Sequence, residues 1–228
     1  MKRLTVFISY STKNARIASA FKTAFDELGC EAYLAHDDLN DSAKWRKSIA
    51  ERIRAAHLFI PVVTREFLGS FEANQEVGIA LALKRPMSAF FVGVQKDCGV
   101  LLENQGTFVR RKDIHTANHR ELAKNKIMSA LRAQPHLKVT AMHSVIEKLS
   151  HTSSNYQRRD LAEILASMDR IIKKDARAIF RRVMKDGSFA TTFIAEPFLR
   201  QVFSANRRYI TPPLRDKILF LLDTMAAH

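Results

Sequence analysis

The chain has 228 residues and a mass of 26.0 kDa, with 46% hydrophobic and 26% charged residues, so it is long enough to bury a substantial core and has the composition of a soluble globular protein. Its seven glycines, six prolines and two cysteines exclude collagen-like and low-complexity chains, disulfide scaffolds and four-cysteine zinc sites. No apolar run reaches the roughly 20 residues that span a bilayer, and no signal peptide is recognisable, so we expect a cytoplasmic protein with no membrane partner.

The net charge of +14 and the pI of about 10.1 are the unusual bulk properties. The excess is +7 in residues 1–135 and +7 in residues 136–228, so no basic tail carries it. A field of this sign attracts polyanions or phosphate-bearing small molecules. A solvated basic surface explains the charge equally well.

The first 135 residues alternate strand and helix patterns. Leu4–Ile8 is a nearly continuous apolar run, as in a strand buried on both faces, whereas residues 14–28 repeat apolar side chains at helical spacing. Pro61 is awkward in its predicted strand because it cannot donate to a central ladder. Strands are predicted at 4–8, 31–35, 58–63, 88–94 and 107–109, and helices at 14–28, 45–56, 70–84 and 119–133.

This alternation predicts an α/β fold with an open, doubly wound, five-stranded parallel sheet. Ligands of such sheets bind beyond the carboxyl ends of the strands. That rule selects three segments, which are Ser9–Asn14, Ala35–Trp45 and Thr64–Glu76.

The remaining residues predict helices alone, at 139–150, 157–185, 194–204 and 213–226. We therefore expect two domains, an α/β domain at residues 1–135 and a smaller all-helical domain at residues 136–228. No motif indicates what the helical domain binds.

Four motifs are absent from the sequence: the Gly-x-Gly-x-x-Gly dinucleotide fingerprint, the Gly-Lys-Ser/Thr phosphate loop, the His-Glu-x-x-His zinc motif and the Gly-x-Ser-x-Gly elbow. His115 and His119 are four residues apart, but no third ligand is close in sequence, so surface histidines are favoured and no metal is expected.

Glu76 is the carboxylate with an unusual position. Ala73 precedes it by three residues, and Ile79 and Ala80 follow at three and four, so Glu76 lies at or near the apolar face of a helix that packs on the sheet. A dehydrated carboxylate in a cleft is a functional candidate. The structural alternative is a boundary residue favoured by the helix dipole, which fully explains Glu72 in the first turn.

Residues 4–133 resemble a TIR (Toll/interleukin-1 receptor) domain of the bacterial kind. The resemblance rests on Val-Phe-Ile-Ser-Tyr-Ser at residues 6–11, Gly29, the loop from Asp38-Leu39 to Trp45 and Ile49, Phe-Ile-Pro-Val-Val at residues 59–63, and Ser70 followed by Glu76. The chain differs from the family at Ser42, where a glycine is usual, and at Glu72, where a tryptophan is frequent.

Many bacterial TIR domains cleave NAD, so the resemblance implies an NAD glycohydrolase or ADP-ribosyl cyclase with Glu76 as its catalytic residue. NAD is then the substrate, no cofactor is needed, and the products are nicotinamide and ADP-ribose or cyclic ADP-ribose. The implied setting is antiphage defence, with self-association through TIR domains and a downstream effector or nucleotide ligand. The candidate substrate-binding residues are Ser9, Tyr10, Ser11, Asn14, Leu39, Trp45 and Phe71.

Within this set the aromatic side chains are candidates to hold rings, and the polar side chains, beside a helix N-terminus, are candidates to hold phosphate. Core packing is the alternative for Trp45 and for Tyr10. Two other functions stay open for the whole chain: a non-catalytic TIR interaction and signalling module, and a nucleic-acid or nucleotide sensor that uses the basic helical domain.

Overall fold

A computed structural model of the chain describes residues 3–35, 42–94, 106–149, 151–168 and 193–227, together with residues 177, 180, 181 and 184. The chain divides into two compact units. One consists of Leu4–Asp26 and Cys30–Ala130, and the other of Met1–Arg3, Glu27–Gly29 and Leu131–His228. The domain limits predicted at residues 135 and 136 stay a prediction.

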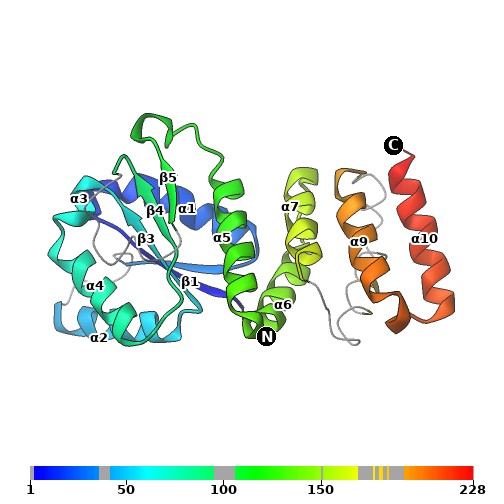
Figure 1. Ribbon diagram of the computed structural model, residues 1–228, viewed down its shortest axis with the longest axis horizontal. Helices are drawn as coiled ribbons and strands as arrows, with labels where there is room; N and C mark the ends of the chain where they lie inside the picture. Colours follow the sequence, from blue (N-terminus) through cyan, green and yellow to red (C-terminus); the bar gives the residue numbers. More distant parts are fainter. Residues whose placement is uncertain are drawn as a thin grey trace. The chain divides into compact units, whose positions relative to one another are not determined.

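A five-stranded parallel sheet forms the centre of the first unit (Figure 1). Its strands are β1 (Thr5–Ser9), β2 (Glu31–Leu34), β3 (Leu58–Val63), β4 (Ala89–Val92) and β5 (Gly106–Val109), in the order β2-β1-β3-β4-β5. The predicted doubly wound sheet is confirmed. The order reverses between β1 and β3, which is where ligands bind in folds of this kind.

Helices follow the strands of this unit. Phe21 of α1 stacks on Phe90 of β4 with ring centroids 4.0 Å apart, and Lys126 of α5 lies 5.0 Å above the same ring, so α1 and α5 share one face of the sheet. Helices α2 and α4 pack against each other and against β1. The helical elements are η1 (Thr12–Asn14), α1 (Ala15–Glu27), α2 (Ser42–Ala55), α3 (Arg65–Leu68), α4 (Phe71–Ala82), η3 (Arg111–Asp113) and α5 (His119–Ala133).

Pro61 lies within β3 as predicted, and the ladder accommodates it. On one side it pairs with Ser9 at the last position of the β1 register. On the other side, Phe59 exchanges hydrogen bonds with Pro86 and Ser88, and pairing with β4 resumes only at Val62. The interruption falls where proline has no N–H to donate.

The second unit contains helices and no strand among its described residues. These are η4 (Pro135–Leu137), α6 (Lys138–Leu149), α7 (Asn155–Ala166), η6 (Phe193–Ala195), α9 (Glu196–Asn206), η7 (Arg207–Tyr209) and α10 (Pro212–Ala226). In this unit α7 packs against α6 and α9, and α9 against α10. No helix in the described ranges is long and apolar enough to cross a membrane.

One predicted helix, at residues 157–185, is wrong in its extent. Helix α7 ends at Ala166, where Ser167 is the C-cap and its Oγ donates to the carbonyl of Ile164 at 2.7 Å. A serine hydroxyl competes for backbone acceptors in this way, and apolar periodicity does not report such an ending.

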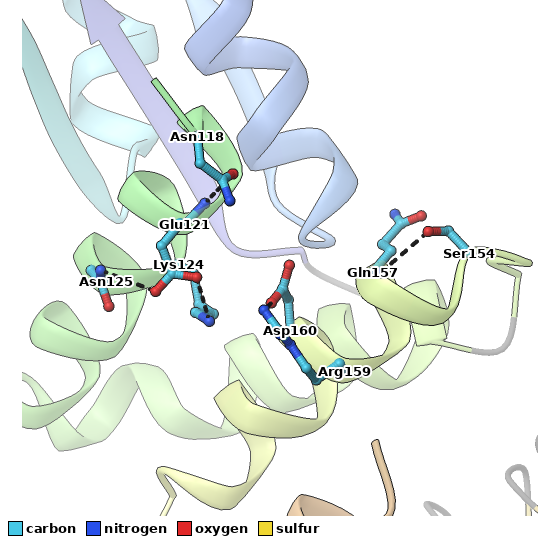
Figure 2. Close-up of polar contacts among 8 residues, drawn as sticks. All are labelled: Asn118, Glu121, Lys124, Asn125, Ser154, Gln157, Arg159 and Asp160. Carbon is cyan, nitrogen blue, oxygen red and sulfur yellow. Dashed lines mark hydrogen bonds and ion pairs between the residues drawn. The ribbon is translucent and has the colours of Figure 1, made fainter. Parts of the chain in front are cut away.

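Side-chain caps fix where two helices begin (Figure 2). Asn118 Oδ1 accepts from the backbone N–H of Glu121 at 3.1 Å, and the Glu121 carboxylate then pairs with Lys124 at 2.7 Å. Ser154 Oγ accepts from Gln157 N–H at 3.4 Å at the start of α7. Each cap satisfies a backbone donor that the first helical turn leaves without a partner.

Substitution of Gly106 is expected to destabilise the sheet. A Cβ at Gly106 would overlap the ring of Phe91, which is buried and stacks on Phe108 with centroids 4.8 Å apart. We expect Gly106→Ala to lower the free energy of unfolding by about 1–3 kcal/mol, measured by urea denaturation. The matched control is Gly78→Ala in α4, where an added Cβ would have no atom within 4 Å outside the backbone of its own helix. This variant should raise the free energy of unfolding by about 0.5–1 kcal/mol. Equal stability of the two variants would contradict this interpretation of the β4–β5 contact.

Candidate active site

The site is built at the carboxyl end of β1. Four of the five β1 residues are buried, including its last residue Ser9, because the strand lies between β2 and β3. Ser9 is paired with Pro61 of β3, so its position is set by the central register of the sheet. The serine hydroxyl therefore stands at the edge where the strand order reverses.

Helix α4 supplies the carboxylate. Ser70 caps the helix by accepting from Ala73 N–H at 3.3 Å, and the Asn74 side chain donates to the carbonyls of Leu68 and Ser70 at 3.1 and 2.7 Å. These bonds fix the first turn and with it the rotation of the helix. The buried face that results consists of Ala73, Glu76, Val77 and Ala80, and Glu76 is 1% exposed.

Ser9 and Glu76 meet in this buried space. Ser9 Oγ donates to Glu76 Oε2 at 2.5 Å, which is the length of a charge-assisted hydrogen bond. The other oxygen, Oε1, is buried and has no hydrogen-bond partner among the described residues. Burial raises the pKa of the Glu76 carboxyl to about 7, opposed by the Ser9 hydrogen bond and reinforced by the charge of Glu72. Glu76 is thus a dehydrated acid with one acceptor atom left over.

A pocket of about 480 Å³ opens beside this acid. It is formed by one face of α4 together with Ile49 of α2, and Glu76 is part of its wall. Its volume is in the range of small-molecule sites. The lining residues are Ile49, Glu72, Gln75, Glu76, Gly78, Ile79 and Ala82.

Only some of the other predicted site residues lie near the carboxyl end of β1. Tyr10, Ser11 and Asn14 are buried just after β1, and Asn14 Oδ1 accepts from Thr64 Oγ1 at 2.7 Å. Thr64 in turn caps α3 by accepting from Phe67 N–H at 3.0 Å. Asn14 therefore joins the ends of β1 and β3.

Among the described residues, Glu76 is the one predicted site residue that lines the pocket, and none of the predicted substrate-binding residues does. Phe71 is 72% exposed and is not among the residues that line it. Leu39 lies outside the described residues. The backbone of Trp45 is in α2, but its side chain is outside the described part of the structure. Their roles stay predictions.

Sequence reasoning missed most of the pocket lining. Glu72 and Ile79 share the face of Glu76 because they stand four residues before it and three after it, and Gln75 joins this wall because it stands three residues after Glu72 and four before Ile79. That spacing is present in the sequence, but the helix dipole alone already accounts for an acidic residue at Glu72, so the pattern does not indicate a pocket. Ile49 had no local signal, since its place beside α4 is a tertiary contact.

Metal ligands do not gather here. Among the described residues there is no group of three or more histidine, cysteine, aspartate or glutamate side chains that would hold a metal ion.

The comparison with protein families gives a match. The family profile described as TIR domain matches residues 6–123, which include all of β1 but its first residue, the whole of α4 and every described residue of the pocket. The comparison with curated proteins finds no match.

The buried acid predicts a pH-dependent stability. The folded chain holds the Glu76 proton more tightly than the unfolded chain, so this contribution is complete below the ordinary pKa of 4.5 and is lost as pH rises through about 7. Glutamine keeps an acceptor for Ser9 and never ionises. We expect Glu76→Gln to be more stable than the wild type by about 3 kcal/mol near pH 8 and equal to it near pH 4, measured by urea denaturation.

The control for this measurement is Glu51→Gln, which removes the same charge from an exposed position of α2. Its stability should follow the pH dependence of the wild type. If Glu76→Gln also follows the wild type at both pH values, the Glu76 carboxyl has no raised pKa.

Proposed function

The chain belongs to the TIR domain family, and from this premise we propose that it is an enzyme that cleaves the bond between nicotinamide and ribose in NAD. The family includes NAD-cleaving enzymes as well as signalling adaptors. The observation that favours the enzyme is the Glu76 carboxylate, which is 1% exposed, oriented by Ser9 and placed in the wall of a pocket.

The chemistry requires one carboxylate. In NAD the nicotinamide is a pyridinium cation, so when the bond between its nitrogen and ribose C1′ breaks, the electron pair returns to nitrogen and nicotinamide departs neutral. No acid has to protonate the leaving group, in contrast to most glycosidases. Positive charge develops on the ribose, and a negative carboxylate in a dehydrated site stabilises it strongly.

The two oxygens of Glu76 suit two tasks. Oε2 accepts from Ser9, which holds the carboxylate in one orientation, and Oε1 is left to accept from a ribose hydroxyl. The ribosyl cation is then attacked at C1′ by water, which gives ADP-ribose and a proton, or by a group of the same molecule, which gives cyclic ADP-ribose. The proposed reaction is therefore that of an NAD nucleosidase or ADP-ribosyl cyclase.

The remaining residues take supporting roles in this proposal. The rings of the substrate would lie on the aromatic side chains, and its phosphates beside the start of η1 and α1. The proposed substrate-binding residues besides Ser9 are Tyr10, Ser11, Asn14, Leu39, Trp45 and Phe71.

The biological setting is part of the same proposal. We place the TIR domain at residues 1–135 and a helical domain at residues 136–228, in a bacterial, cytoplasmic protein of antiphage defence. Self-association of TIR domains would complete the pocket, and a nucleotide product would act on a downstream effector.

The test is incubation of the full chain with NAD, with nicotinamide and the nucleotide product followed by chromatography and mass. We expect Glu76→Gln to lower kcat/KM by about 100- to 1000-fold, the scale of a lost electrostatic stabiliser. Because the carboxylate acts when ionised, the wild-type rate should rise with pH through about 7. Self-association predicts a specific activity that increases with protein concentration.

Glu51→Gln is the control, and its activity should equal that of the wild type. Wild-type rates in Glu76→Gln would remove Glu76 from the mechanism. Absence of NAD cleavage by the wild type at every protein concentration would favour the non-catalytic interaction module.

A second candidate function, binding of nucleic acid, is favoured by arginines in and around η7, whose own two arginines are exposed. Arg177 Nε donates to the carbonyl of Tyr209 at 2.8 Å, and Arg215 Nε to that of Ile210 at 2.8 Å. The guanidinium of Arg208 lies 4.7 Å from the Tyr209 ring. In the described part of the chain none of these three pairs with a carboxylate, so their charge is available to phosphates.

This candidate is tested by a gel shift of the full chain with DNA and with RNA at low and at physiological salt. If it holds, Arg207→Glu/Arg208→Glu should weaken binding and lower the slope of log affinity against log salt by about two. The control, Arg54→Glu/Lys112→Glu, changes charge equally in the other unit and should keep that slope. No shift at low salt would eliminate this function.

A further inference from the structure

Glu72 lines the same pocket as Glu76, one helical turn before it. Residues four apart on a helix are neighbours on one face, so both carboxylates face the pocket from α4. The rest of the described lining consists of the amide of Gln75 and four residues without polar side chains. Within the described residues, no lysine, arginine or histidine lines this pocket, although the chain carries a net charge of +14.

The position of Glu72 is fixed by the start of the helix. Ser70 Oγ, which caps α4 by accepting from Ala73 N–H, also donates to Glu72 Oε2 at 3.3 Å. The side chain lies in the first turn, where the helix dipole favours a negative charge. The Glu72 carboxylate is therefore held in place at the pocket, and it is exposed to solvent, unlike Glu76.

Two like charges at this spacing repel each other in the free protein. The charge of Glu72 acts on the Glu76 carboxyl, and Glu76 Oε1 is buried without a hydrogen-bond partner among the described residues. A cation in the pocket would relieve this repulsion, and a hydroxyl of the same ligand would supply the donor that Oε1 lacks. The body of this ligand has to be largely apolar, because Ile49, Ile79 and Ala82 form the remaining wall.

We propose that Glu72 is a specificity-determining residue, whose carboxylate makes the pocket select a positively charged aromatic ring over a neutral ring of the same shape. The inference rests on the proposed function for the identity of that ring, the pyridinium of NAD. Reduced NAD carries a neutral dihydropyridine, so the same contact would favour the oxidised form. Glu72 thereby binds the leaving group, and Glu76 acts on the ribose.

The experiment compares two probes on the full chain, 1-methylnicotinamide, which is a cation, and nicotinamide, which is neutral. Their dissociation constants are measured by ligand-observed NMR titration near pH 8, where Glu76 is ionised. We expect the wild type to prefer the cation, Glu72→Gln to reduce the ratio of affinities by about five- to tenfold, and Glu72→Lys to reduce it further. Glu51→Gln, which removes an exposed carboxylate outside the pocket lining, should keep the wild-type ratio.

The outcomes separate this inference from the proposed function. If the ratio is unchanged in both Glu72 variants, or if the wild type does not bind 1-methylnicotinamide, the inference is overturned even where NAD is cleaved. If the ratio depends on Glu72 but NAD is not cleaved, the selection of a cation stands and the proposed function fails. Because Glu72 is exposed, both variants should keep the wild-type fold by circular dichroism.

Discussion

The burial of the Glu76 carboxylate is the constraint on which the rest of the site depends. Removing an ionised carboxylate from water costs several kcal/mol, and this carboxylate has only the Ser9 hydroxyl as a described donor. A helix that packs on a sheet would be more stable with an apolar residue at that position. In the observed arrangement one carboxylate oxygen has no described hydrogen-bond partner. A dehydrated carboxylate of this kind can stabilise positive charge in a ligand.

Two independent features of the backbone bring Ser9 and Glu76 together. The β1–β3 register places Ser9 opposite Pro61 at the edge where the strand order reverses. The cap at Ser70 fixes where α4 begins, and since each residue turns a helix by about 100°, a start one residue later would rotate Glu76 away from Ser9. The contact of 2.5 Å between strand and helix thus depends on backbone features remote from the carboxylate.

Much of this could be predicted from the sequence, because it follows local periodicity. The alternation of strand and helix patterns along the chain predicted the five strands. The apolar residues three and four positions from Glu76 predicted that it lies on the buried face of its helix. Interactions that leave no periodic pattern in the nearby sequence could not be predicted. Ser167 ends α7 through its own hydroxyl, inside an apolar repeat that continues to predict helix. Ile49 reaches the pocket only because α2 packs against α4, and no pattern within α2 indicates that neighbour.

Glu72 and Glu76 are two carboxylates on one helix that lie in different environments. They differ by a single turn, yet Glu72 is exposed at a capped helix start, whereas Glu76 is 1% exposed beneath it. An exposed carboxylate can attract a cation from solution. The charge of a dehydrated carboxylate is weakly screened, so it acts strongly on a charge close to it. When two carboxylates have such different environments, they are suited to different steps of one reaction. Glu72 stands where a tryptophan is frequent in TIR domains, so under the proposed function this chain would hold the ring of its substrate by charge instead of by stacking.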